Sequence, residues 1–207
     1  MIPSSVSPDN KADSPVPGGL RPALTLFLVL TMITGVLYPL AILLMGRAFF
    51  PHQARGSMVT HQRRVVGSAL VGQSGRDAVF FWSRPSAIDG RSITSGGSNL
   101  SVLNPMLEAQ VTSRTRTARV ASRQSSANPI PVDLVTASAS GLDPHISPAA
   151  ALWQIPRVAE ARKMEVAELE AMVRAHMEPR TWGILGEPRV NVLLLNIDLL
   201  ERQGSHP

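Results

Sequence analysis

A stretch of 25 residues without a charged side chain, Pro22–Gly46, constrains this chain more than any other feature. As a helix rising about 1.5 Å per residue, it would be about 37 Å long, enough to cross a hydrocarbon core of about 30 Å with some tilt. Arg21 and Arg47 flank the stretch and can extend their charged ends toward the two headgroup layers. We therefore expect one transmembrane helix over residues 22–46.

Two other interpretations of this stretch fit its pattern less well. A cleavable signal peptide has a shorter apolar core and a cleavage site of the A-x-A kind, and no such site follows here. A buried helix of a soluble protein rarely reaches this length without one charge. Within the expected helix, Gly35 offers a small-residue surface for a neighbouring helix, and Pro39 is expected to bend the last turns.

The rest of the 207-residue chain divides into a short lead and one modest domain. Residues 1–20 are rich in Ser, Pro, Gly and Asp and have no apolar periodicity, so we expect a disordered N-terminal extension. Residues 48–207 interleave short strand-like and helix-like patterns. The predicted fold is therefore an α+β soluble domain anchored by one N-terminal transmembrane helix.

The predicted elements of this domain are short. Strands are expected at Val65–Val71, Val132–Thr136 and Val190–Leu195, the last followed by a short helical tail. Helices are expected from Pro105 to about Arg123, from Pro148 to about Lys163 and from Val166 to Met177. Asn104 and Ser147 precede the first two helices and are the residue types that accept hydrogen bonds from a helix N-terminus.

Composition argues against several classes of site. Because the chain has no cysteine, it has no disulfide, thiolate metal ligand or cysteine nucleophile. The five histidines have spacings that make no metal pair on one helix face, and we expect most of them to be surface residues. The net charge is +5, but the arginines are scattered and there is one tyrosine, which argues against nucleic-acid binding. No phosphate-loop, zinc-protease or serine-hydrolase motif occurs, so no catalytic or metal site is predicted.

The most suggestive local pattern is a loop of small residues between a predicted strand and a predicted helix. Its members are Ser138, Ala139, Ser140, Gly141 and Leu142. Small residues let backbone N–H groups approach an anion, and the helix that follows Ser147 adds the partial positive charge of its N-terminus. A tight turn required only for packing explains the same residues and is the commoner outcome. The residues alone leave both interpretations open.

Two polar features lie on predicted helices. Gln154 precedes Pro156, which removes a helix hydrogen bond and should kink the helix, and the neutral amide of Gln154 can both donate and accept. The alternative is a surface glutamine on a bent helix. Arg116, Arg119 and Arg123 share one helix face. Solvent exposure of this face is the default, and contact with anionic headgroups or an acidic subunit is the alternative.

Blocks of sequence along the chain form a recognisable series. They include Arg21–Leu24 (RPAL), Thr34–Leu40 (TGVLYPL), Ser95–Leu100 (SGGSNL), Leu134–Asp143 (LVTASASGLD), Trp153–Ala159 (WQIPRVA) and Leu195–Asn196. In this order the blocks resemble the C chain of Kdp-type potassium-transporting P-type ATPases. The resemblance covers about Arg21 to Leu200, whereas residues 1–20 depart from the family pattern.

The resemblance implies a non-catalytic accessory subunit of an ATP-driven, high-affinity potassium uptake complex, needed for its assembly and stability. Its partners would be a potassium-binding A chain, an ATP-hydrolysing B chain, a small F chain and the lipid bilayer. The family's C chain is described as promoting ATP binding by the B chain, which implies ATP shared with that chain and no tightly bound cofactor. By position, this implies a nucleotide-binding role for Ser138 to Leu142 and for Gln154. Arg21, Gly35 and Pro39 would serve membrane anchoring and helix packing.

Charge and resemblance predict different membrane sides for the C-terminal domain. The positive residues near the helix are Lys11 and Arg21 before it and Arg47, Arg55, Arg63 and Arg64 after it. A count of these residues alone would place the domain in the cytoplasm. The resemblance implies a single-pass protein of the bacterial inner membrane with an extracytoplasmic domain. Long domains cross with little regard to charge, so we expect the domain outside.

Two functions of other classes remain compatible with the sequence. One is a membrane-anchored extracytoplasmic hydrolase, which the absence of a nucleophile–base motif disfavours. The other is an anchored binding protein that acts alone. Turnover by the purified soluble domain without partners would favour the hydrolase. Co-purification separates the binding protein from a pump subunit, because a subunit should leave the membrane together with its partners.

Overall fold

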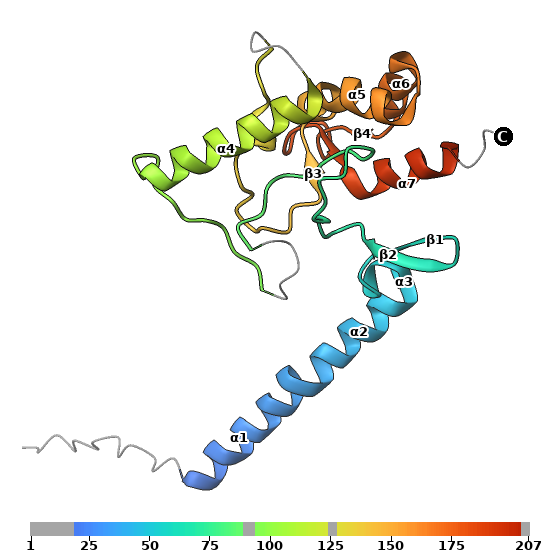
Figure 1. Ribbon diagram of the computed structural model, residues 1–207. Coiled ribbons are helices and arrows are strands. Elements are labelled where there is room, and N and C mark those ends of the chain that lie inside the picture. Colours follow the sequence, from blue (N-terminus) through green and yellow to red (C-terminus); the bar gives the residue numbers. More distant parts are fainter. Residues whose placement is uncertain (1–18, 89–93, 124–127, 204–207) are drawn as a thin grey trace, which may run out of the picture. The chain divides into compact units, whose positions relative to one another are not determined.

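The computed structural model describes residues 19–88, 94–123 and 128–203 (Figure 1). Most of the predicted N-terminal extension, up to residue 18, therefore lies outside the described residues. The chain divides into two compact units, Met1–Ala54 and Arg55–Pro207.

The first unit is one long helix, drawn in blue in Figure 1. It consists of α1 (Leu20–Met32), the π-helical turn η1 (Ile33–Leu37) and α2 (Tyr38–Phe49), and the short α3 (Pro51–Ala54) follows it. The 30 residues Leu20–Phe49 are long and apolar enough to cross a membrane, and their apolar window is not buried against the chain itself. The predicted anchor helix is confirmed, and it extends slightly past both predicted ends.

The π-helical turn lies directly before Pro39. Proline has no N–H to donate to the carbonyl of Gly35, and its ring crowds that carbonyl, so a wider turn relieves the conflict. The hydroxyl of Thr34 donates to the carbonyl of Leu30 over 2.7 Å in the same region. The structure therefore places the local distortion of the helix in the turn before Pro39, around Gly35.

The second unit contains both helices and strands, so the predicted α+β class is confirmed. Its elements are β1 (Met58–His61), β2 (Arg64–Ser68), α4 (Pro105–Ser122), η2 (Val132–Leu134), β3 (His145–Ile146), α5 (Pro148–Arg162), α6 (Val166–Ala175), β4 (Met177–Glu178), β5 (Arg189–Asn191) and α7 (Val192–Gln203). Strands β1 and β2 form an antiparallel hairpin. Strand β5 lies between β3 and β4 in a small antiparallel sheet, with Ile146 and Met177 both opposite Val190.

One hydrophobic core joins the sheet to α5, α6 and α7. Its fully buried side chains include Ile146, Val158, Leu169, Val173, Val190, Leu195 and Leu199. Helix α6 contributes Leu169, Met172 and Val173, whose spacing of three and four residues puts them on one helical face. Phe81 also belongs to this core, although it comes from the irregular chain between β2 and α4. That irregular chain therefore contributes to the core as the regular elements do.

The predicted starts of two helices are confirmed. The side chain of Asn104 accepts a hydrogen bond from the N–H of Met106 at the start of α4, and Ser147 accepts one from Ala150 at the start of α5. Both helices end on a residue in the left-handed conformation, Arg123 and Lys163. Local residue chemistry thus determined both ends of these helices closely.

The predicted strand Val132–Thr136 is wrong, because the segment forms the tight turn η2. The N–H and the hydroxyl of Thr136 both donate to the carbonyl of Val132, over 2.9 and 2.8 Å. The carboxylate of Asp133 accepts the N–H of Ser147 over 2.6 Å. Such local side-chain bonds compete with a strand ladder and favour the turn.

The predicted strand Val190–Leu195 is correct only at its beginning. The strand β5 ends at Asn191, whose side-chain oxygen accepts the N–H of Leu194 over 3.2 Å and so caps α7. Val192–Leu195 is consequently helical. The strand predicted at Val65–Val71 is β2, which begins at Arg64 and ends at Ser68.

Candidate functional site

Two side-chain amides hold the irregular segment at residues 81 and 82. The amide of Gln154, on α5, accepts the N–H of Trp82 over 2.7 Å and donates to its carbonyl over 3.1 Å. Asn196, on α7, makes the same pair of bonds with Phe81, over 2.8 and 2.9 Å. The two amides thus take the place of a strand partner that this backbone does not have.

Arg157 completes this arrangement one helical turn after Gln154. Its guanidinium donates to the carbonyls of Asp77, Ala78 and Phe80 and, over 2.8 Å, to the side-chain oxygen of Gln154. Its charge also lies 4.2 Å from the centre of the Trp82 ring. Burial lowers the pKa of Arg157 to about 10, so the guanidinium stays charged at neutral pH. We call Gln154, Arg157 and Asn196 the amide–arginine cluster.

The structure corrects one interpretation of Gln154. The residue has no exposed surface, so it is not a surface glutamine. Its nitrogen donates to Trp82 and Ala150, and its oxygen accepts from Trp82 and Arg157. An amide has two N–H groups and two lone pairs, so every hydrogen-bonding position of Gln154 is used inside the protein. The nucleotide role that the resemblance implies for Gln154 stays a prediction.

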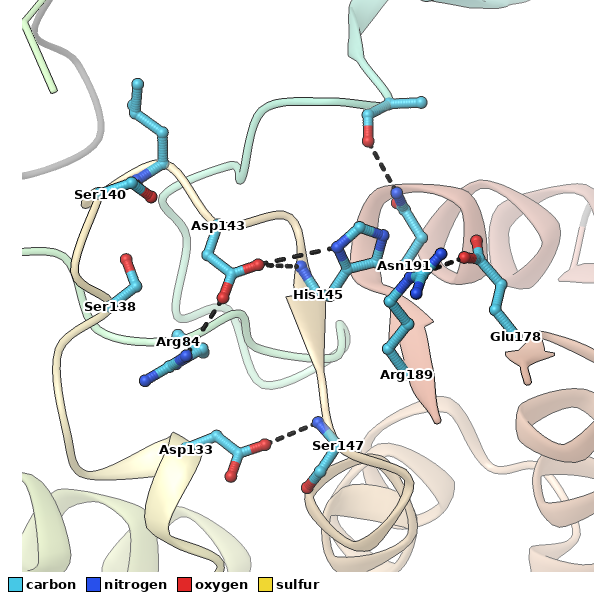
Figure 2. Close-up of polar contacts among 12 residues, drawn as sticks. Arg84, Asp133, Ser138, Ser140, Asp143, His145, Ser147, Glu178, Arg189 and Asn191 are labelled. Carbon is cyan, nitrogen blue, oxygen red and sulfur yellow. Dashed lines mark hydrogen bonds and ion pairs between the residues drawn. The ribbon is translucent and has the colours of Figure 1, made fainter. Parts of the chain in front are cut away.

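The loop Ser138–Leu142 is also bonded internally. Figure 2 shows Ser138 and Ser140 on this loop beside Asp143. The N–H of Ser138 donates to the carbonyl of Pro85 over 3.1 Å, and the N–H of Gly141 donates to the Ser138 hydroxyl over 2.9 Å. The N–H of Leu142 donates to the Ser140 hydroxyl over 3.1 Å. Three of the loop's five N–H groups therefore already have acceptors within the chain.

Other segments pack closely around this loop. A Cβ added to Gly97 would lie 2.8 Å from the carbonyl oxygen of Ala139, and one added to Gly141 would lie 2.6 Å from a side-chain carbon of Ile88. Gly141 also has a φ of +70°, which favours glycine. The carbonyl of Ser140 accepts the N–H of Gly96 over 2.8 Å. These contacts are what a tight packing turn requires, whereas anion binding by Ser138, Ala139, Ser140, Gly141 and Leu142 stays a prediction.

The end of the loop is tied to a distant arginine. Asp143 lies 3.1 Å from the guanidinium of Arg84, and it accepts the N–H of His145 over 3.0 Å (Figure 2). Asp133 accepts the N–H of Ser147 at the start of α5, so a carboxylate of the chain already lies at that helix N-terminus. At the N-terminus of α5, the second place where the sequence suggested an anion, the chain thus supplies a negative charge of its own.

The remaining candidate residues lie apart from the cluster. Arg123 forms an exposed ion pair with Glu160. His61, His145 and His176 are partly buried and lie 3.5–3.8 Å from carboxylates, so the expectation of plain surface residues is wrong for these three. Among the described residues, no group of three or more metal-ligand side chains comes together.

Sequence reasoning missed Arg157, which bonds to Gln154, and Asn196, which bonds to Phe81. Both lie inside blocks that carry the family resemblance, Trp153–Ala159 and Leu195–Asn196. Their place in these blocks was the one feature of the sequence that could have pointed to them. It could not show which backbone groups they bind, because the side chains of Gln154 and Asn196 bond to residues 72 and 115 positions away in sequence.

Comparison with known proteins gives the family. The profile of the KdpC family, described as "K+-transporting ATPase, c chain", matches residues 20–201. The chain belongs to the KdpC family. KdpC subunits of potassium-transporting ATPases from Burkholderia mallei and Burkholderia pseudomallei are each 50% identical to it over 189 residues, covering 90% of this chain and 97% of theirs. The KdpC subunit of Sorangium cellulosum is 53% identical over 183 residues, covering 87% of this chain and 96% of its own.

Membership of the KdpC family makes the chain a subunit of a potassium-transporting ATPase. The matched region includes the anchor helix and the whole amide–arginine cluster. The helix Leu20–Phe49, the one such helix in the described part of the chain, suits anchoring of this subunit by one pass through a membrane.

Proposed function

We propose that this chain is a non-catalytic accessory subunit needed for assembly and stability of an ATP-driven potassium uptake complex at the bacterial inner membrane. The observation that carries the proposal is the exposed, apolar helix Leu20–Phe49 in a chain of the KdpC family. A helix without buried surface in its own chain is covered by lipid and by neighbouring helices. A Cβ at Gly35 would meet nothing within 4 Å, so this position is open for close approach of another helix.

A turn of the soluble domain offers a second contact surface for the pump. Between β4 and β5, Trp182 is 85% exposed and Ile184 is 74% exposed. Two backbone hydrogen bonds between Thr181 and Leu185 hold the turn, and Trp182 has a φ of +54°, which a bulky residue rarely adopts. Such a rigid, exposed apolar tip loses little conformational freedom when it binds.

The charges around this tip favour a protein partner. At its base, Arg180 contacts both carboxylate oxygens of Glu187 at 2.7 Å, and Arg189 pairs with Glu178 at 2.9 Å. An apolar centre with a polar rim is the usual anatomy of a protein interface. A tip that inserts into lipid is normally accompanied by unpaired basic residues. The tip of Trp182, Ile184 and Leu185 therefore contacts another subunit of the pump.

The first test is co-purification from a gentle detergent. The tagged chain should leave the membrane in fixed ratio with a potassium-binding A chain, an ATP-hydrolysing B chain and a small F chain. Gly35→Leu should lower the yield of this complex about fivefold, equivalent to about 1 kcal/mol of helix association, with Ala41→Leu as a small-residue control on the same helix. Recovery of the wild-type chain alone would refute the subunit role.

Trp182→Ser tests the tip separately. The substitution should lower complex yield while the unfolding midpoint of the isolated chain stays unchanged, because Trp182 packs little within its own chain. Val120→Ser removes another exposed apolar side chain and serves as the control. Equal yields for the Trp182 variant and the wild type would remove the tip from the interface.

The finer proposal is that the chain promotes ATP binding by the B chain, with Ser138 to Leu142 and Gln154 near nucleotide. Its support is the family resemblance, and it requires these groups to exchange their internal hydrogen bonds for ATP. An extracytoplasmic domain does not meet cytoplasmic ATP. Protease access to the domain in intact spheroplasts therefore decides between the nucleotide role and an extracytoplasmic position. A domain digested from outside, or a Gln154→Ala complex with unchanged apparent affinity for ATP, would refute the nucleotide role.

A further inference from the structure

Three arginines that the subunit role does not use line one pocket of about 220 Å³. They are Arg76 and Arg84, from the irregular chain after β2, and Arg114, from α4. Ser74, Ser83 and Ser86 line the same pocket. The pocket is therefore built from segments about 30 residues apart and is polar and cationic. None of the described residues that line it carries a carboxylate.

The positive charges around the pocket exceed the negative ones. Arg84 is paired with Asp143 at 3.1 Å. Arg114 donates to the carbonyl of Val135 over 3.1 Å, and Arg76 lies over the ring of Trp82 at 5.5 Å from its centre. Burial lowers the pKa of Arg76, and the nearby charge of Arg114 lowers it further. Within the described part of the chain, the pair of Arg84 with Asp143 is the one ion pair that these three guanidinium groups make, which leaves the charges of Arg76 and Arg114 in excess.

One donor in this group has no acceptor. The Nε of Arg84 is buried and has no hydrogen-bond partner among the described residues, although the same guanidinium bonds to Asp143 through Nη1. A buried donor left unpaired costs about 1–3 kcal/mol. Native proteins retain few such groups, and they often mark the position of an ion. An oxyanion in the pocket would offset the repulsion between Arg76 and Arg114.

We propose that this pocket binds a phosphate-type oxyanion, held by the guanidinium groups of Arg76, Arg84 and Arg114. Planar guanidinium groups bind phosphate and sulfate through paired hydrogen bonds and are the preferred side chains for them. The polar lining suits a phosphoryl group better than a nucleoside, which binds mainly to apolar and aromatic surface. Inorganic phosphate, a lipid headgroup and the end of a polyphosphate chain share this chemistry. The site does not depend on the proposed subunit role.

The test is calorimetric titration of the detergent-solubilised full-length chain with inorganic phosphate at low ionic strength. Arg76→Gln should weaken phosphate binding at least about tenfold, because it removes one charged hydrogen-bonding partner. Arg76→Lys keeps the charge but not the planar guanidinium group. Its affinity for phosphate should lie between those of the wild type and of Arg76→Gln. Arg64→Gln makes the same charge change on the exposed strand β2 and should leave the affinity unchanged.

Separate titrations identify the source of the oxyanion. Glycerol 3-phosphate stands in for a lipid headgroup, and ATP stands in for a polyphosphate chain; the tightest Arg76-dependent binder names the source. The proposal is overturned if the wild-type chain binds none of the three up to about 10 mM. It is equally overturned if Arg64→Gln weakens binding as much as Arg76→Gln, since the effect would then be one of net charge. Neither result bears on co-purification with the pump, so the two proposals fail separately.

Discussion

Two arginines lie over the indole ring of Trp82, Arg157 at 4.2 Å and Arg76 at 5.5 Å from its centre, but the groups around the two guanidinium ions differ. Arg157 donates to three backbone carbonyls and to Gln154. Arg76 lines a pocket together with Arg84 and Arg114. Desolvation lowers the pKa of both arginines, so a lowered pKa alone does not distinguish their roles.

The number of hydrogen-bond acceptors around each guanidinium distinguishes Arg157, which has a structural role, from Arg76, which we propose binds a ligand. The irregular chain at residues 77–82 leaves carbonyls without a strand partner, and Arg157 satisfies them from α5. The buried guanidinium needs acceptors and the buried carbonyls need a donor, so each satisfies the other. The amide–arginine cluster is therefore a part of the core. The arginine pocket has an excess of donors over acceptors, and this excess is what a ligand would use.

The largest expected effect is on the structural arginine. Arg157→Met keeps much of the apolar stem but leaves the carbonyls of Ala78 and Phe80 without the donor that Arg157 supplies, so the free energy of unfolding should fall by roughly 3–5 kcal/mol. Denaturant unfolding of the detergent-solubilised chain measures it. Arg174→Met, at an exposed position on α6, is the control and should change stability by less than about 0.5 kcal/mol. A loss below about 1 kcal/mol for Arg157→Met would contradict the structural role.

Gly141→Ala tests the packing turn that leads to Asp143, the partner of Arg84. It should lower the free energy of unfolding by about 2–4 kcal/mol, because the new Cβ meets Ile88 and the carbonyl of Gly96 at a positive φ. Gly56→Ala isolates the conformational part, since Gly56 has a φ of +80° and no neighbour within 4 Å of an added Cβ. It should cost about 1–2 kcal/mol. Equal losses in the two variants would show that the turn is not closely packed.

Asp143→Asn tests the charge balance of the arginine pocket. The amide keeps the shape of the side chain but removes the carboxylate that pairs with Arg84, the one ion pair of the three arginines in the described structure. Stability should fall by no more than about 1 kcal/mol, because both partners are partly exposed. Phosphate affinity should rise a few-fold, because a repelling charge is gone. Weaker phosphate binding in this variant would argue against an oxyanion at Arg84.

Arg76→Gln should have the smallest effect on stability. Removing a partly buried cation that faces Arg114 relieves repulsion and desolvation, so the free energy of unfolding should stay within about 0.5 kcal/mol of the wild type or rise slightly. The same unfolding titration used for Arg157→Met measures it. A loss comparable to that of Arg157→Met would abolish the distinction between the two arginines.

Features that depend on neighbouring residues were predictable from the sequence. The anchor helix follows from the length of an uncharged stretch, and α4 and α5 follow from Asn104-Pro105 and Ser147-Pro148 at their starts. The turn η2 escaped prediction, because its apolar residues also fit a strand. The side chain of Asp133, which bonds to a helix 14 residues away in sequence, decides between the two.

By itself, the sequence determined the membrane anchor, the α+β class, the family and the main helix boundaries. Each of these depends on residues that lie close together along the chain. Only the tertiary structure decided what Gln154 does and which arginines meet. A backbone without regular structure takes its hydrogen-bond partners from wherever the fold brings them, here α5 and α7, 72 and 115 residues further along. The arginine pocket likewise exists only because α4 packs beside the chain that carries Arg76 and Arg84.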